Sequence, residues 1–240
     1  MINPANVLLC PVCGAENNHL HVTCAKCGAY LQRKIENLDL FDTAWSIIES
    51  PRTAFHWIAV SKHKNYSIFL SCVAGIGLAF TLCWLFKAGD YSDQLIAIMG
   101  AGLAMGPLLG VIFVLLSSAI TWSLLEMAKE QLPFRTVFAL SAYSMIPVVI
   151  SAITILPIEL MTFGIYLFTS APSPYLLHPT SFVIIAILDG ACGLWAILLF
   201  FIGLRTVLGA GMGKVLRIGL SSLAVFAAAC IGIFFFLKKL

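Results

Sequence analysis

Charged residues are scarce in this chain of 240 residues: Lys, Arg, Asp and Glu together make up only 10% of it, against roughly 25% in a soluble globular domain. Apolar residues make up 60% of the chain, where roughly 45–50% is usual. This composition excludes a soluble domain. Together with a mean hydropathy of +0.99 and long uncharged runs, it predicts an all-α polytopic membrane protein.

Other absences narrow the function further. The net charge of +3 is small and dispersed along the chain, which argues against a nucleic-acid partner. No Lys or Arg precedes Cys10 and the apolar run before it is short, so we expect no cleavable signal peptide. No nucleophile stands in a recognisable pattern with a general base, and we therefore predict that the protein is not an enzyme.

Cysteine is concentrated at the amino terminus, where Cys10, Cys13, Cys24 and Cys27 form two CxxC pairs with ten residues between them. A glycine follows each pair and can adopt the positive φ that a tight turn needs. Four thiolates on two such turns make a closed tetrahedral site, for which zinc is the usual structural metal. Residues 1–31 are therefore predicted to be a zinc-ribbon hairpin in which the metal supplies most of the folding free energy.

Other interpretations of the cysteines fit less well. Two disulfides would require an oxidising compartment, whereas the charge pattern described below places this segment in the cytosol. Rubredoxin-type iron sites use similar knuckles, although their pairs lie much farther apart; iron and redox-active thiols are the remaining alternatives to zinc. His19 and His21, between the pairs, are expected to be solvated loop residues rather than ligands. A closed site has no open coordination position, so catalysis by this metal is not expected.

Residues 32–65 are predicted to be a linker with amphipathic interfacial helices. Leu38, Phe41, Ala44, Trp45 and Ile48 recur at the spacing of one helix face. Ser50-Pro51 is typical of an N-cap followed by the first residue of a second helix. Tryptophans among basic residues favour helices that lie in the lipid head-group layer. The alternative is that both helices pack against the membrane bundle.

Residues 66–240 are predicted to form a bundle of five transmembrane helices. Each apolar segment has at least the roughly 20 residues that a bilayer crossing requires. Pro107 is expected to kink the second segment, and Pro147 and Pro157 leave open whether the third is one span or is broken. The five segments are Tyr66–Phe86, Leu95–Leu125, Thr136–Met161, Phe182–Leu204 and Ile218–Leu237.

Basic residues orient this bundle. The positive-inside rule places the amino terminus in the cytosol and the carboxyl terminus outside, as expected for a multi-pass protein of the cell (inner) membrane. Lys238 and Lys239 disagree, but late charges weigh less than the earlier pattern. The basic residues on the inner side are Lys26, Arg33, Lys34, Arg52, Lys62 and Lys64 before the first span, Lys129 and Arg135 after the second, and Arg205, Lys214 and Arg217 after the fourth.

Three local patterns resemble the Yip/Yif domain family of membrane proteins. They are Ser50-Pro51-Arg52-Thr53-Ala54-Phe55, then Phe134-Arg135-Thr136-Val137-Phe138 leading to Tyr143-Ser144-Met145-Ile146-Pro147, and Trp195 through Gly203-Leu204. The resemblance covers roughly residues 38–238 and implies five spans behind an amphipathic stretch. It also implies an amino-terminal zinc ribbon, which prokaryotic members often carry. Eukaryotic members act in vesicle traffic and bind Rab GTPases; the ribbon indicates a prokaryotic cell, so we do not transfer that partner.

Asp189 is the polar residue of greatest interest in the predicted spans. An aspartate at the centre of a span costs about 2.5–3.5 kcal/mol on insertion scales and usually faces a bundle interior or a wet cavity. A structural hydrogen bond to Ser, Thr or Tyr143 of another span is one interpretation, and proton or ion handling is the other. Glu159 lies near the outer end of the third segment and is a candidate to line the same polar region; a surface position beside Pro157 is the alternative.

Gly102, Gly106 and Gly110 recur every four residues in the second segment. Small residues on one helix face let another helix approach closely. This packing can occur within one chain, which we favour, or between two chains of a homo-oligomer.

Two functions follow from these features. The first is a membrane scaffold or interaction protein in membrane organisation or trafficking, whose zinc ribbon and interfacial helices bind a protein partner. The alternative is a small ion- or solute-coupled transporter or channel that uses Asp189.

Overall fold

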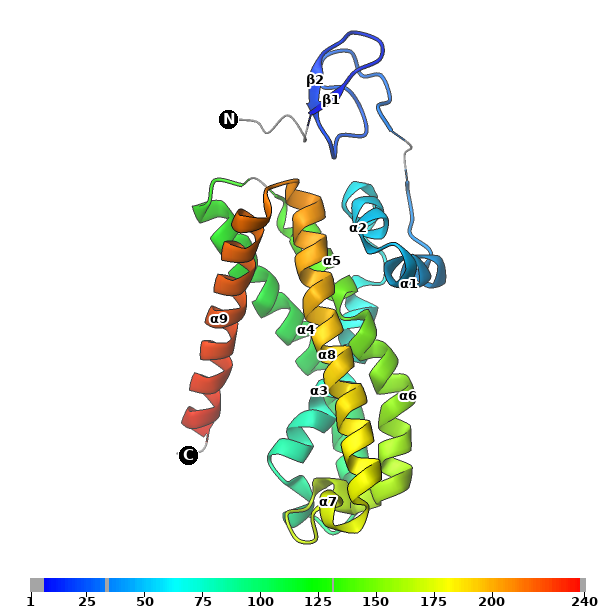
Figure 1. Ribbon diagram of the computed structural model, residues 1–240, viewed down its shortest axis with the longest axis vertical. Helices are drawn as coiled ribbons and strands as arrows, with labels where there is room; N and C mark the ends of the chain where they lie inside the picture. Colours follow the sequence, from blue (N-terminus) through cyan, green and yellow to red (C-terminus); the bar gives the residue numbers. More distant parts are fainter. Residues whose placement is uncertain (1–6, 33–34, 131, 238–240) are drawn as a thin grey trace. The chain divides into compact units, whose positions relative to one another are not determined.

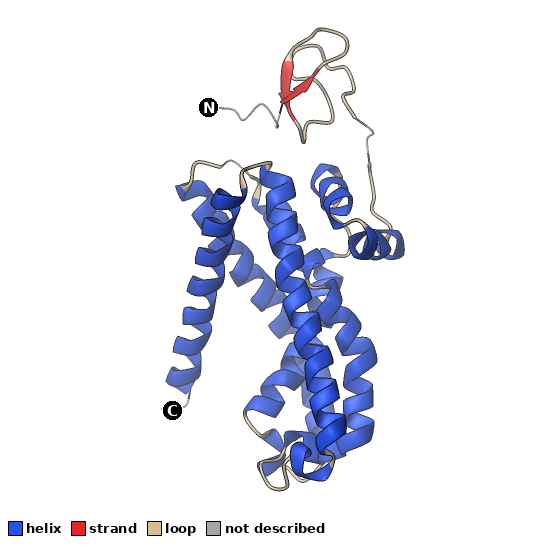
Figure 2. Ribbon diagram, in the orientation of Figure 1, coloured by secondary structure: helices blue, strands red, loops and turns tan. Residues whose placement is uncertain are grey.

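The computed structural model describes residues 7–32, 35–130 and 132–237, and it is helical apart from one short hairpin near the amino terminus (Figures 1 and 2). Four basic residues used above to orient the bundle, Arg33, Lys34, Lys238 and Lys239, lie outside the described residues. The chain divides into two compact units. Unit 1 comprises residues 1–66, 116–141 and 199–240, and unit 2 comprises residues 67–115 and 142–198.

The hairpin of unit 1 pairs strand β1 (Val7–Leu9) with strand β2 (Glu16–Asn18). The strands are antiparallel, with Leu8 opposite Asn17. A further bridge joins Thr23 to Tyr30. Neither strand reaches the usual length of roughly 5–6 residues, so backbone pairing alone cannot stabilise this segment.

Two short helices follow in unit 1, α1 (Leu40–Glu49) and α2 (Pro51–Val60), as the sequence predicts. The carboxylate of Asp39 caps α1 by accepting a hydrogen bond from the Asp42 N–H at 3.0 Å. At the carboxyl end of α2, the Lys64 Nζ donates to carbonyls of the last helical turn, including that of Ile58 at 2.8 Å. Burial, followed by the charge of Arg135, lowers the pKa of Lys64 to about 8.

The two helices differ in burial. In α2, Phe55 and Ile58 are almost fully buried, and the Phe55 ring lies where a side chain on Gly203 would stand. In α1, by contrast, Phe41 is 82% exposed and Trp45 is 68% exposed. Thus α2 packs as the bundle alternative expects, whereas α1 buries Ile47 on one side and leaves an apolar face exposed on the other, as an interfacial helix would.

Four helical stretches among the described residues are long and apolar enough to cross a membrane. The fifth predicted span corresponds to helix α9 (Met212–Leu237), which is not among those four, so the count of five stays a prediction. The four are α3 (Ser67–Leu85), α4 (Leu95–Met127), α5 (Phe134–Ser144) with α6 (Ile146–Phe163), and α8 (Pro179–Leu208). Short helices η2 (Ala88–Asp90), η3 (Gly164–Phe168) and α7 (Pro174–Leu177) connect them.

The third span is broken. Helix α5 ends at Ser144, and Met145 has a ψ of 1° before α6 begins. Pro147 stands in the first turn of α6, where its missing N–H would have no helical partner anyway. Pro157 instead lies inside α6, so only one of the two prolines accompanies a break.

Glycines bring α3 and α4 into close contact inside unit 2. A Cβ on Gly75 would lie 2.2 Å from the Gly106 carbonyl oxygen, and a Cβ on Gly110 would lie 2.0 Å from the Ser71 carbonyl oxygen. A Cβ on Gly102 would lie 2.9 Å from the Phe80 ring. The predicted glycine face is therefore used for packing within the chain.

Each unit has its own apolar cluster. In unit 1, Leu125, Val137 and Leu204 are buried together with residues of α9. In unit 2, Phe80 and Phe168 are buried together near the loop ends of the helices. Their rings lie 6.0 Å apart, within the range of a favourable aromatic pair.

Candidate metal centre and intramembrane cavity

The two cysteine knuckles have the same backbone construction. They run over Cys10–Ala15 and Cys24–Ala29, and in each the N–H of the first residue donates to the carbonyl of the last, at 2.9 and 2.8 Å. The intervening glycine donates back to the first carbonyl at 2.9 Å in both. Gly14 and Gly28 have φ values of 68° and 73°, which confirms the predicted need for glycine.

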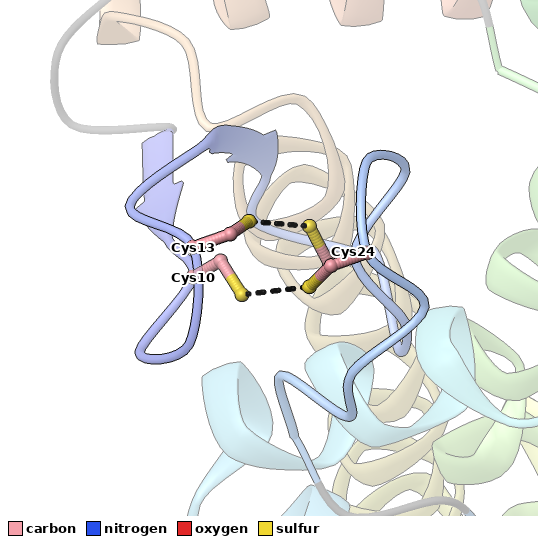
Figure 3. Close-up of side chains that lie close together, drawn as sticks. Cys10, Cys13 and Cys24 are labelled. Carbon is pink, nitrogen blue, oxygen red and sulfur yellow. Dashed lines mark hydrogen bonds between the residues drawn. The ribbon is translucent and has the colours of Figure 1, made fainter.

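These turns bring the four cysteine sulfurs together, all within 4.8 Å of one another (Figure 3). The Cys10–Cys27 and Cys13–Cys24 Sγ–Sγ distances are both 3.6 Å. Sulfurs placed tetrahedrally at a Zn–S distance of roughly 2.3 Å would be about 3.8 Å apart, whereas a disulfide requires roughly 2.05 Å. The donor set and its spacing therefore fit a four-thiolate metal site, and these four cysteines are free.

Asn17 joins the two knuckles, and sequence reasoning did not find it. Its side chain is 7% exposed and donates to the Ala15 carbonyl at 2.8 Å in the first knuckle. The same amide accepts from the Ala25 N–H at 2.9 Å and donates to the Cys24 Sγ at 3.6 Å in the second. The sequence carries no signal for this role, because the position of Asn17 opposite Leu8 depends on the hairpin register.

Hydrogen bonds from the turn favour the charged form of two cysteines. The Cys27 backbone N–H, and after it that of Lys26, lowers the pKa of Cys24 to about 6. The Cys13 backbone N–H likewise lowers the pKa of Cys10. Because only a thiolate ligates metal well, these N–H groups favour metal binding by Cys10 and Cys24.

Neither histidine of the ribbon belongs to the cysteine cluster, as expected. His19 is not simply solvated, however. Its Nε2 lies 3.3 Å from the Thr206 carbonyl oxygen, its ring stacks on that of His56 with centroids 6.4 Å apart, and its Nδ1 is buried. Gln32 completes this cluster, because its amide accepts from His56 at 3.0 Å and donates to the His19 carbonyl at 2.8 Å.

A second group of polar residues surrounds a cavity inside unit 2. The Ser151 hydroxyl of α6 donates to an Asp189 carboxylate oxygen of α8. Glu159, two helical turns beyond Ser151 on α6, interacts with the same carboxylate. These three side chains line a cavity of about 450 Å³, within the roughly 300–1,000 Å³ typical of small-molecule sites.

Most of the cavity wall is apolar or small. Aromatic side chains of α3, α4 and α8, among them Trp84, Phe113 and Phe182, face the space together with several alanines and glycines. Tyr143, the third polar candidate, is fully buried and is not among the residues that line the cavity. The structure thus brings Asp189 and Glu159 together. The hydroxyl that donates to Asp189 belongs to Ser151 and not to Tyr143.

Comparison with known proteins supplies one result. A family model of the Yip1 domain matches residues 45–234, which is well over half of the chain. The chain belongs to the Yip1 domain family. No curated protein and no solved structure matches it.

Only one of the two candidate sites lies within the matched residues. The Yip1 domain contains the cavity with Asp189 and Glu159, whereas all four cysteines precede it. Membership therefore supports a multi-pass membrane protein in contact with the bilayer and brings no catalytic signature. The cysteine cluster is an addition to the domain, and its role has to be argued from its own geometry.

Proposed function

We propose that this Yip1 domain protein is a membrane-embedded adaptor in membrane organisation or trafficking. Its ribbon binds a structural zinc ion and recruits a protein partner, and the helical domain anchors that partner at the bilayer. The observation that carries the proposal is the closed cluster of Cys10, Cys13, Cys24 and Cys27. Four protein ligands occupy all the coordination positions of a tetrahedral zinc ion, so no position is open to a substrate. Such a site instead fixes the shape of a binding surface.

Helix α1 supports the same role. Phe41, Trp45 and Ile48 lie on one face of the helix, and they are 82%, 68% and 40% exposed. Asp42 and Glu49 occupy other faces of this ten-residue helix. An exposed apolar stripe with a tryptophan favours a helix lying at the membrane surface, next to the cytosolic ribbon that the positive-inside rule predicts.

The metal is tested by element analysis of the purified protein. Wild type is expected to carry one zinc ion per chain, and Cys24→Ser is expected to lose it. Cys72→Ser is the matched control, because Cys72 lies in α3 outside the cluster. Iron in place of zinc, or full metal content in Cys24→Ser, would contradict the assignment.

Recruitment is tested by crosslinking and co-purification from native membranes at matched abundance of wild type, Cys24→Ser and Cys72→Ser. The partner is expected to crosslink to Lys26, which lies in the second knuckle. It should be lost from Cys24→Ser alone. A partner retained by all three variants, or no partner in wild type, would remove the basis for an adaptor.

Coupled transport is a second candidate, because Asp189 and Glu159 line a cavity of about 450 Å³. Such carboxylates inside a membrane domain commonly mark ion or proton pathways. Proton-driven solute uptake by reconstituted vesicles is expected to disappear in Asp189→Asn. Unchanged uptake in that variant would eliminate this candidate.

A further inference from the structure

The cavity of unit 2 contains acidic groups without a basic counterpart. Asp189 and Glu159 are the ionisable carboxylic acids among its described lining residues, which include no Lys, Arg or His. Asp189 lies ten residues after Pro179, the first residue of α8, or roughly 15 Å along the helix. At such a depth a carboxylate is costly unless a partner compensates its charge.

Ser151 compensates only part of that cost. Its hydroxyl donates to one Asp189 oxygen, and Glu159 approaches the same group from α6. Two carboxyl groups and one hydroxyl offer too few oxygens for a bare divalent cation, since Ca²⁺ takes 6–8 and Mg²⁺ an octahedral set. A ligand that carries its own hydrogen-bond donors suits these groups better.

The remainder of the wall indicates what else this ligand needs. The cavity of about 450 Å³ is lined chiefly by apolar side chains, with Phe80, Phe113 and Phe182 among them. A small inorganic ion would leave that apolar space empty. A hydrocarbon body would fill it, and aromatic faces near a cationic head add a favourable cation–π interaction.

We propose that this cavity binds a hydrophobic amine: its ammonium group pairs with Asp189 and Glu159, and its hydrocarbon body fills the apolar space between α3, α6 and α8. Binding requires neither the ribbon nor the adaptor role. The proposal supplies a substrate class for the transport candidate, but it holds equally if the amine binds without being moved. The charge pattern and the cavity carry it independently of the metal centre.

Three probes with one hydrocarbon cage separate charge from shape: 1-aminoadamantane, 1-adamantanol and adamantane-1-carboxylate. Equilibrium binding of each is measured to the full chain in nanodiscs of zwitterionic lipid, after subtraction of partition into empty nanodiscs. No ion gradient is present, so the result is independent of transport. We expect the amine to bind at least tenfold more tightly than the alcohol and the carboxylate to bind weakest.

Two variants locate the site. Asp189→Asn is expected to weaken the amine at least tenfold and to leave the alcohol unchanged, whereas the matched variant Asp93→Asn alters an exposed loop acid and should change neither. A Cβ on Gly193 meets no atom within 4 Å, so Gly193→Phe is expected to fill the cavity and weaken all three probes. Glu159→Gln serves as the second charge variant if Asp189→Asn fails to fold by thermal unfolding.

The outcomes are distinct. Equal binding of amine and alcohol would overturn the charge pairing, and binding unaffected by Gly193→Phe would overturn the cavity as the site. Absence of binding by any probe would overturn the proposal as a whole. Amine binding with no flux would retain the site and reject only the transport candidate.

Discussion

The ribbon and the α3–α4 contact bring backbone segments together by opposite means. In the ribbon, strands of three residues are too short to hold the knuckles, and four sulfurs within 4.8 Å supply the fixed point. In the membrane domain, glycines remove side chains so that two helices nearly touch, as at Gly75 and Gly110. The ribbon is therefore built around side chains that can bind a metal, whereas the helix contact is built on the absence of side chains.

Metal removal should give the largest difference in stability between the ribbon and the membrane domain. Structural zinc contributes about 10–16 kcal/mol in zinc-finger peptides, and the described ribbon has little apolar core to replace it. A strong chelator is therefore expected to abolish hydrogen-exchange protection over residues 7–32 while amides of α3 and α6 keep theirs. Refilling with Zn²⁺ should restore protection. A ribbon that stays protected after complete metal removal would contradict this account.

Gly110→Leu should break the helix contact and spare the ribbon. Its Cβ would lie 2.0 Å from the Ser71 carbonyl oxygen, and a backbone atom cannot rotate away as a side chain can. We expect a loss of about 3 kcal/mol or more, measured as a lower unfolding temperature in detergent. Gly100→Leu is the matched control on the same helix, because a Cβ there meets no atom within 4 Å. Equal effects of the two variants would show that close packing is not the cause.

The sequence predicts the ribbon better than the membrane domain. The CxxC spacing alone identifies the four cysteines that cluster and the turn glycines, because the chemistry of a four-thiolate site leaves few arrangements. It does not identify Asn17, since an asparagine that bridges two turns has no periodic signature. Its interaction with Cys24 appears only when the hairpin register is known.

In the membrane domain, periodic patterns predict which segments are helical but not which polar groups meet. Asp189 was evident from hydropathy, whereas its partner Ser151 resembles any other serine in an apolar span. The break before Pro147 occurred and one at Pro157 did not, because the effect of a proline depends on whether its turn begins or continues a helix. Long-range pairing, unlike local period, is not encoded at a fixed spacing.

The smallest predicted effect concerns His56, through which the ribbon contacts α2. Burial, followed by the charge of His19, lowers the pKa of His56 below the unfolded value of roughly 6.5. A base with a lowered pKa stabilises its contact fully above the unfolded pKa. That contribution is lost as the pH falls through the folded pKa. Acidification from about pH 7.5 to about pH 5.5 is therefore expected to increase hydrogen exchange at α2.

His56→Gln is expected to remove that pH dependence, because a glutamine amide can still donate to Gln32, as His56 does at 3.0 Å, and does not titrate in this range. His63→Gln is the control, since His63 lies beyond α2 in the segment that leads to α3. Acid-dependent exchange that survives in His56→Gln would exclude His56 as its source and would direct attention to His19 and to the cysteine centre, whose thiolates also take up protons at low pH. In the second case, protonation of the cysteine centre, rather than of a histidine, would control the contact between the ribbon and α2 as the pH falls.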